Sequence, residues 1–401
     1  MISAVDAEER RNEPRDLWVL YFGYYMALGA LSPYIALYYE RSGLSGVQIG
    51  LLSSLILAMT SLTAIPWGAV ADRYRLHRPI LSVAFLLAGA FVFLISLTTN
   101  FLLLIPLVLG YALFIAPIVP LLDSSAVAAA KAGRRSFGQI RVGGSLGWIV
   151  SVWLVGILVQ SFGMRWLFYI CIVSMALTLF YVLSHPPRSA SSQIEIGRNL
   201  RLLLSDRSVV FFLLSVFLVA VGNGAVQNFF SLYLDGIGAQ AGVIGAAWAV
   251  AAISEIPVML ASGKLLRWIG PAGLLKIAFF VYALRWLLFS FIHDPLWALA
   301  AQPLQGLSFA AYLTAGVTYL NERTPEGLGA TAQAVLGVVS FGVAAIVGSL
   351  AGGYLYDHAG MPVFFRIFSA VTLAGLVLFW LTSAQPRRGP QGATPESSAR
   401  P

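Results

Sequence analysis

The chain has 401 residues, of which 59% are hydrophobic and 10% are charged, and its mean hydropathy is +0.82. Soluble domains carry about 25% charged residues, so a water-soluble fold, a disordered chain and a collagen-like repeat are all excluded, and lipid must solvate most of the chain. The net charge of +8 does not indicate nucleic-acid binding, because the basic residues form short clusters between apolar stretches, as in membrane proteins.

The predicted elements begin with a polar tail, residues 1–16, which has no cleavable signal pattern. A membrane span needs about 20 mostly apolar residues, because an α-helix rises 1.5 Å per residue across roughly 30 Å of hydrocarbon. Twelve stretches meet this requirement: 17–39, 47–67, 79–98, 101–122, 138–160, 164–184, 208–234, 243–262, 273–292, 295–320, 328–354 and 361–382. We therefore expect an all-α membrane protein with twelve transmembrane helices.

The polar segment 185–207 divides the chain into two halves of six spans, 17–184 and 208–382, and a second tail covers 383–401. The halves resemble each other, since Gly68 after the second span and Gly263 after the eighth each precede a basic loop. Two similar halves with equal numbers of spans predict parallel repeats, related by an axis along the membrane normal. Segment 185–207 is then a tether between the halves.

The distribution of basic residues predicts the orientation. All but four of the 25 Lys and Arg residues lie in the two tails, the tether and the alternate loops that share their side of the membrane. Arg41 and Arg165 lie on the other side, and Arg285 and Arg366 lie within spans. Because cytoplasmic loops carry an excess of Lys and Arg, we expect both termini to be cytoplasmic and the protein to reside in the cell (inner) membrane.

The run GAVADRYRLHRP, residues 68–79, resembles the Gly-x-x-x-Asp-Arg loop between spans 2 and 3 of the major facilitator superfamily. Gly68, Asp72 and Arg73 occupy the motif positions. The resemblance implies the major facilitator fold and assigns these three residues to a gate that holds the halves together in one state. The matching loop of the second half keeps Gly263 but has Arg267 in the acidic position.

Further runs resemble the branch that contains the phenylpropionate, nucleoside and oligosaccharide proton symporters. They are PLLDSSA (120–126), FGQIRVGGSLGW (137–148), ISEIP (253–257), ALRWLLF (283–289) and AQPLQG (301–306). The sugar symporters of that branch use a His and a Glu on span 10, where this chain has Gln302 and Gln305. This difference counts against sugar specificity.

Two acidic residues, Asp123 and Glu255, lie outside the tails, loops and final helical turns. A charge at the bilayer centre costs about 2.5–3.5 kcal/mol on insertion scales, so such residues usually have a function. Glu255 and Arg285 each lie about twelve residues, roughly 18 Å, into adjacent spans from opposite sides. We expect them to pair near the midplane, either as a fixed lock between helices or, with Asp123, as proton-coupling groups.

Amide side chains surround this pair in the sequence. Asn223 and Gln227 are one turn apart on span 7 and share a face. Gln302 and Gln305 lie roughly 10 and 15 Å into span 10. We interpret all four as candidate substrate contacts, although buried amides also bond neighbouring helices.

Asp123 lies near the inner end of span 4, and Arg141 opens span 5 across a short basic loop. They are close enough in sequence to pair at the cytoplasmic mouth. In the sugar-symporter relatives, an acid on span 4 and an arginine on span 5 contact the substrate. A substrate contact and a salt bridge at the inner gate therefore both remain open.

Aromatic residues are the remaining candidates for substrate contact. Tyr25 shares a face of span 1 with either Tyr21 or Tyr24, and Trp248 lies two turns before Glu255 on one face of span 8. Tyr offers a flat ring and a hydroxyl group to a substrate. Packing between helices is the alternative role for all of these rings.

These features predict proton-coupled symport of a small organic solute, such as an aromatic acid, a nucleoside or a sugar-like compound, by alternating access. An anionic solute suits Arg285 and Arg141. The alternative is a proton-coupled drug or metabolite antiporter, which an arginine at the depth of Glu255 disfavours. A non-transporting membrane receptor or assembly factor is the least favoured class, because the loops are short and no soluble domain is present.

An enzyme is excluded because the sequence has no Gly-rich phosphate loop, no metal-ligand cluster and no plausible catalytic triad. We accordingly expect no catalytic residue, no metal and no cofactor. The single cysteine, Cys171, lies in an apolar run. The expected partners are a small-molecule substrate, protons and the lipid bilayer, without nucleic acid, and the expected state is a monomer.

Overall fold

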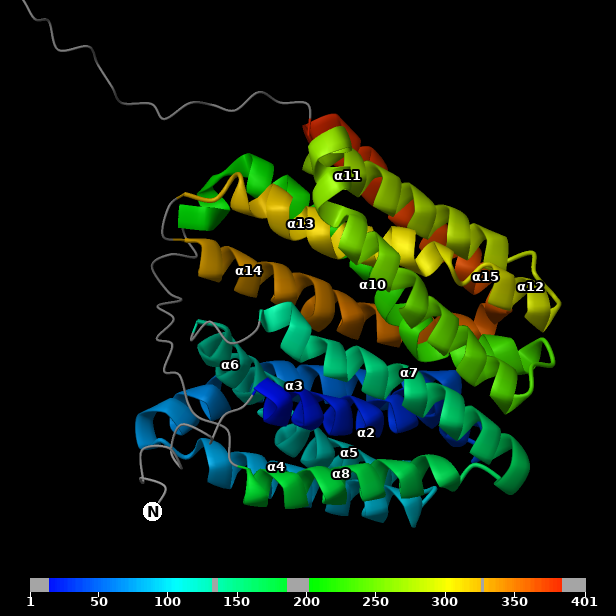
Figure 1. Cartoon of the computed structure of the whole chain (residues 1–401). Helices are drawn as coiled ribbons and strands as arrows, with labels where there is room; N and C mark the ends of the chain where they lie inside the picture. The colour runs from blue at the N-terminus through cyan, green and yellow to red at the C-terminus, as the bar shows by residue number, and fades with distance from the viewer. Residues whose placement is uncertain (1–13, 132–135, 186–201, 326–327, 384–401) are drawn as a thin grey trace, which may run out of the picture.

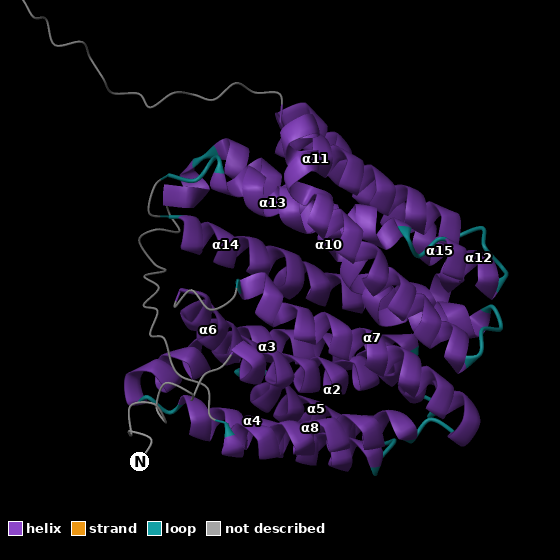
Figure 2. Ribbon diagram, in the orientation of Figure 1, coloured by secondary structure: helices purple, strands orange, loops and turns teal. Residues whose placement is uncertain are grey.

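The structure is a computed structural model that describes residues 14–131, 136–185, 202–325 and 328–383. Most of the tether predicted over 185–207, and most of the two tails, therefore lie outside the described residues. Figure 2 shows that the described chain is built from helices joined by short loops.

The first half of the chain forms a bundle of helices that match the six predicted spans. Its helices are α2(Pro14–Arg41), α3(Gly46–Tyr74), α4(His77–Ser96), α5(Phe101–Ile115), α6(Ile118–Lys131), α7(Phe137–Phe162) and α8(Trp166–Ser184). Helices α5 and α6 together form the fourth span, and the break between them contains Pro117. Ser45 and Ser136 begin α3 and α7 with capping boxes, in which Gln48 and Gln139 bond back to the capping residue.

The second half forms an equivalent bundle. Its elements are α10(Arg207–Gly236), α11(Ala241–Phe289), α12(Pro295–Ala300), the π-helical segment η2(Gly306–Ala310), α13(Ala311–Asn321), α14(Gly329–Gly337), the π-helical segment η3(Val338–Val343) and α15(Ala344–Ser383). Gly270 (φ 72°) and Gly360 (φ 74°) interrupt α11 and α15. Each of these helices is therefore two spans joined at a glycine, which tolerates positive φ.

The twelve predicted spans can be matched to these helices. In the described residues, nine helices are long and apolar enough to cross a bilayer. The bends at Gly270 and Gly360 divide two of them, and the segment from α12 to α13 supplies the remaining span in pieces. All twelve predicted spans are present. Some helices extend beyond the predicted apolar stretches into polar residues, as α3 does through Asp72 and Arg73.

Figure 1 shows the two bundles side by side, with α2 to α8 in one and α10 to α15 in the other. Helix α3 packs against α15, α7 against α11, and α2 against α10. Glycines permit these close approaches: a Cβ atom on Gly50 would lie 2.4 Å from the backbone oxygen of Ser349, and one on Gly245 would lie 2.3 Å from that of Val152.

Polar contacts between the bundles gather at one end of the molecule. We call this end, formed by loops 42–45, 163–165 and 237–240, the closed end. Arg41 pairs with Asp235 at 2.6 Å, and Gln160 donates to Gln240 at 2.7 Å. Within the described ranges, every side-chain hydrogen bond or ion pair found between the bundles lies here. The closed end therefore holds the two halves together in this conformation.

Candidate functional site

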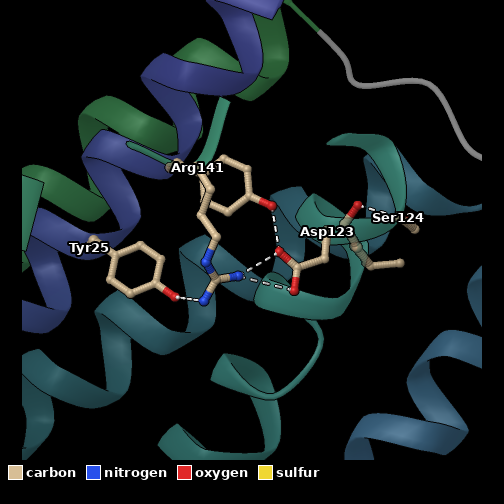
Figure 3. A network of polar contacts seen from close by, with 6 residues as sticks. Tyr25, Asp123, Ser124 and Arg141 are labelled. Carbon is tan, nitrogen blue, oxygen red and sulfur yellow. Dashed lines mark hydrogen bonds and ion pairs between the residues drawn. The ribbon is translucent and has the colours of Figure 1, made fainter. Parts of the chain in front are cut away.

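A polar network in the first bundle joins three helices (Figure 3). Arg141 Nη1 on α7 lies 3.1 Å from Asp123 Oδ1 on α6, and Arg141 Nη2 donates to the Tyr25 hydroxyl at 3.1 Å. The Tyr21 hydroxyl donates to Asp123 Oδ1 at 2.5 Å. We call these four residues the first-bundle cluster. The pairing of Asp123 with Arg141, anticipated from the sequence, is present.

Local structure explains how the cluster assembles. Tyr21 and Tyr25 are four residues apart on α2, so their rings stack on one face with centroids 6.4 Å apart. The capping box at Ser136 starts α7 shortly before Arg141. Gly144 of α7 has no side chain, and a Cβ atom there would lie 2.7 Å from the Tyr25 ring. The absence of that atom lets the ring lie against α7 within reach of the guanidinium group.

The charged members of the first-bundle cluster are partly accessible. The side chain of Arg141 is 44% exposed, and that of Asp123 is 34% exposed. An ion pair with this exposure is screened by solvent, so it can break without a large desolvation cost. The pair can therefore exchange partners, as either a substrate contact or a gate requires.

The second bundle contains a more deeply buried network. Arg285 on α11 is 5% exposed, and its guanidinium group donates to two amide oxygens: Nη1 to Gln305 Oε1, and Nη2 to Gln302 Oε1 at 2.6 Å. Gln305 Nε2 in turn donates to Glu255 Oε1 at 3.3 Å. We call Glu255, Arg285, Gln302 and Gln305 the second-bundle cluster.

The second-bundle cluster depends on a broken helix. Between α12 and η2 the chain turns at residues 301–303, where Pro303 cannot donate a helical hydrogen bond. The Gly306 N–H group donates to Ser254 Oγ at 3.0 Å, and a Cβ atom on Gly306 would lie 2.1 Å from the Ser254 backbone oxygen. This close approach brings Gln305 beside Glu255. Interrupted helices and π-helical turns are frequent at the functional sites of membrane proteins.

A small pocket adjoins the buried guanidinium group, and its cavity volume of about 10 Å³ is roughly the space that one water molecule needs. Its lining consists of polar groups, an aromatic wall and two small apolar residues: Asn223, Gln227, Arg285, Gln302, Gln305, Phe230, Trp248, Val226 and Ala251. A solute larger than water can therefore enter this pocket only after the surrounding helices move apart.

The structure brings most of the predicted residues together, with two differences. Tyr24 is buried and packs edge-on against Phe85 of α4 at 6.5 Å, so it lies in the core of the first bundle rather than in the cluster. The expected direct pair of Glu255 and Arg285 is replaced by a bridge through Gln305. The reason is the broken helix, which inserts an amide group between the two charges.

Phe230 was absent from the sequence-based candidates, although it lines the pocket and packs edge-on against Trp248 at 5.7 Å. Helical periodicity could have identified it, since Phe230 follows Gln227 by three residues and therefore shares its face of α10. Trp248 also contacts Trp148 of the first bundle, with ring centroids 6.4 Å apart. The pocket wall therefore lies at the interface between the bundles.

The gating motif makes local contacts in this conformation. Asp72 Oδ1, near the end of α3, lies 3.1 Å from Nε2 of His77, the first residue of α4, and the Arg73 guanidinium lies 5.8 Å from the Tyr74 ring centroid. Gly68 has no atoms near its potential Cβ position. The loop lies at the end opposite the closed end, where the described residues show no side-chain polar contact between the bundles.

Metal chemistry has no support in the described part of the chain, where no group of three or more His, Cys, Asp or Glu residues is arranged to hold an ion. The two clusters instead offer hydrogen-bond donors, a buried cation and a half-buried carboxyl group. These groups can bind and release a polar solute and a proton.

Comparisons with known proteins agree with this arrangement. The family model described as "MFS_1 like family" matches residues 15–367. The maltose permease of Geobacillus stearothermophilus is 30% identical over 373 residues, which cover 92% of this chain and 94% of the permease. The "Probable 3-phenylpropionic acid transporter" of Escherichia coli (strain K12) is 27% identical over 365 residues, which cover 89% and 95%.

Among solved structures, the crystal structure of the nucleoside transporter NupG matches with a TM-score of 0.83 and 17% identity, covering 93% of this chain and 99% of that one. This match concerns the fold alone. The superfamily and the fold predicted from the sequence are confirmed, and so is the prediction that the chain is a transporter rather than an enzyme.

Proposed function

We propose that this chain, which belongs to the MFS_1 like family of major facilitator transporters, is a proton-coupled symporter that moves a small organic solute by alternating access. The observation that carries the proposal is the chain of contacts from the buried Arg285 through Gln305 to the half-buried carboxyl group of Glu255. It links a cation that lines a pocket to a carboxyl group that can take up a proton.

The orientation follows from the basic residues. The loops at the end opposite the closed end carry most of the Lys and Arg side chains, so we place that end, with both termini, in the cytoplasm. The closed end then faces outward, and the structure represents an inward-facing state. The partial exposure of Asp123 and Arg141 supports this assignment, because the first-bundle cluster is then accessible from the cytoplasm.

The proton carrier is Glu255. It is an acidic residue within the spans, and a carboxyl group in apolar surroundings responds strongly to the charges near it. In the structure, Gln305 donates to this carboxyl group while it accepts from Arg285. A substrate that draws Arg285 away from Gln305 also changes the environment of Glu255. Substrate binding and proton binding are thereby linked.

The first-bundle cluster supplies the opposing wall of the transport path. Tyr25 and Arg141 offer a hydroxyl group, a ring and a partly exposed cation, and Asp123 pairs with that cation. When the bundles rock, the Asp72 loop closes the cytoplasmic end and the contacts at the closed end separate. Substrate and proton then reach the site from the other side.

The experiment is uptake by proteoliposomes that contain the purified chain, with and without an imposed pH gradient. Radiolabelled 3-phenylpropionate, uridine and maltose sample the three solute classes. Glu255→Gln is expected to abolish accumulation driven by the gradient while exchange of substrate between the two sides continues. Glu322→Gln, in an exposed residue beyond the end of α13, is the matched control.

Retention of gradient-driven accumulation by Glu255→Gln would place the proton carrier elsewhere and overturn the mechanism. Proton-driven efflux of lipophilic cations, with no uptake of any of the three solutes, would identify an antiporter instead.

A further inference from the structure

Arg285 is a buried cation, and among the described residues no acidic side chain is paired with its guanidinium group. Its side chain is 95% buried, since 5% remains exposed, and its two terminal nitrogens are held by neutral amide oxygens. Among the described residues its Nε–H group has no hydrogen-bond partner. A buried guanidinium group with a free donor favours an anionic partner, because an isolated charge and an unpaired donor are both costly away from water.

Arg141 differs in each of these respects. It is 44% exposed, it is paired with the Asp123 carboxylate at 3.1 Å, and its second terminal nitrogen donates to Tyr25. Its charge is therefore already balanced. Of the arginines in the two clusters, Arg285 is the one available to an anion.

The pocket beside Arg285 also has walls suited to a flat apolar body. Phe230 and Trp248 form an aromatic corner, and Val226 and Ala251 add small apolar surfaces. The indole N–H group of Trp248 is occupied, since it donates to Ser231 Oγ at 3.0 Å. Trp248 therefore offers its ring surface, rather than a hydrogen bond, to whatever enters.

We infer that the pocket, once the helices around it move apart, binds an aromatic monocarboxylic acid, with the carboxylate on the Arg285 guanidinium group and the aromatic body against Phe230 and Trp248. Gln302 and Gln305 hold the guanidinium plane in position before the acid arrives. Carboxylates pair with guanidinium groups through two parallel hydrogen bonds, which neutral hydroxyl groups cannot reproduce. This inference rests on the proposed function, since it names the substrate class of the same site.

Direct binding tests the inference without any need for transport. Isothermal titration calorimetry on the detergent-purified full chain compares 3-phenylpropionate with 3-phenyl-1-propanol, which lacks the charge, and with uridine and maltose. The acid is expected to bind at least about tenfold more tightly than the alcohol, the scale of one charge-assisted hydrogen bond. Equal affinity for acid and alcohol, or tight binding of uridine or maltose alone, would overturn the inference.

Substitutions of Arg285 test whether the carboxylate binds to its guanidinium group. Arg285→Gln is expected to weaken acid binding at least about tenfold and to leave the weak binding of the alcohol unaltered, and Arg285→Lys should recover part of the affinity for the acid. Arg366→Gln is the matched control, because Arg366 lies over the Phe291 ring at 5.2 Å, away from the pocket. Gel filtration and thermal melting check the fold of each variant.

If Arg285→Gln does not fold, the acid-to-alcohol ratio of Arg285→Lys still decides the matter, because a ratio unchanged from the parent chain would remove Arg285 from the binding site. The outcomes also separate this inference from the symport mechanism. Binding of the acid without proton-driven uptake would leave the inference standing and remove the symport, whereas proton-driven uptake of uridine without acid binding would do the reverse.

Discussion

Asp357 of α15 caps the N-terminus of α3 on the opposite bundle, beginning at Gly46. One carboxylate oxygen of Asp357 accepts from the Gly46 N–H group at 2.6 Å, and the other accepts from the Val47 N–H group at 2.8 Å. Helix N-termini carry unpaired N–H groups and a partial positive charge, so a carboxylate stabilises them. Here the stabilisation also joins the two bundles, because cap and helix belong to different halves.

The first prediction concerns this interbundle cap. Asp357→Ala should destabilise the closed end by about 1 kcal/mol, as the loss of a helix cap does, and shift the population toward the state open at that end by about fivefold. Spin labels at Ser42 and His293, loop residues of opposite bundles on the side of the closed end, would report the change as longer distances in double electron–electron resonance. An unaltered distance distribution would show that the cap does not contribute to closure.

The second prediction ranks a neighbouring contact below the cap. The Arg41–Asp235 pair is 46% and 29% exposed, so solvent screens it, and exposed pairs contribute about 0–1 kcal/mol. Arg41→Ala should therefore shift the same distances less than Asp357→Ala, and added salt should reduce the effect further. A larger shift from Arg41→Ala would mean that charge attraction, rather than helix capping, dominates closure.

The third prediction separates two amides that share one partner. Gln302 and Gln305 both accept from Arg285, but only Gln305 is found donating to Glu255. Gln305→Leu should uncouple proton entry from solute entry, whereas Gln302→Leu should weaken solute binding and keep the coupling. Solute-dependent proton uptake by proteoliposomes, read with an internal pH dye, measures both. If both variants take up the same number of protons per solute molecule, Gln305 has no role in coupling.

The fourth prediction concerns close helix packing. A Cβ atom on Gly50 would lie 2.4 Å from the Ser349 backbone oxygen, a distance that real Cβ atoms do not adopt. Gly50→Val should therefore force α3 away from α15 and lower the population of the conformation in which the closed end is shut. Gly236→Ala is the control, since its added atom meets nothing within 4 Å. Labels at Ser42 and His293 again report the separation, and an unchanged distance in Gly50→Val would mean that the helices can slide to accommodate the side chain.

Much of the architecture was predictable from local composition. Span length follows from bilayer thickness, so the twelve spans agree with the helices to within a few residues except where a helix continues beyond the membrane, as α3 does to Tyr74. The glycines at the bends of α11 and α15 lie between predicted spans. The charges of Glu255 and Arg285 were identifiable because hydrocarbon makes an ionisable residue costly wherever it occurs.

The connectivity of the site was not predictable to the same degree. Helical rise placed Glu255 and Arg285 at similar depths, but it could not show that Gln305 lies between them, because that depends on the broken segment before η2 and on its approach to Ser254. The choice between Tyr21 and Tyr24 likewise depended on which face of α2 meets α6 and which meets α4.

The sequence by itself therefore determined the solvent, the spans, the two halves and the residue types available for binding, since these follow from the free energy of transfer between water and lipid. Only the tertiary structure decided which polar groups meet, which arginine remains without a direct acidic partner, and which end of the molecule is held shut. These relationships depend on helix rotation and on contacts between residues as distant in sequence as Asp357 and Gly46, which no local pattern encodes.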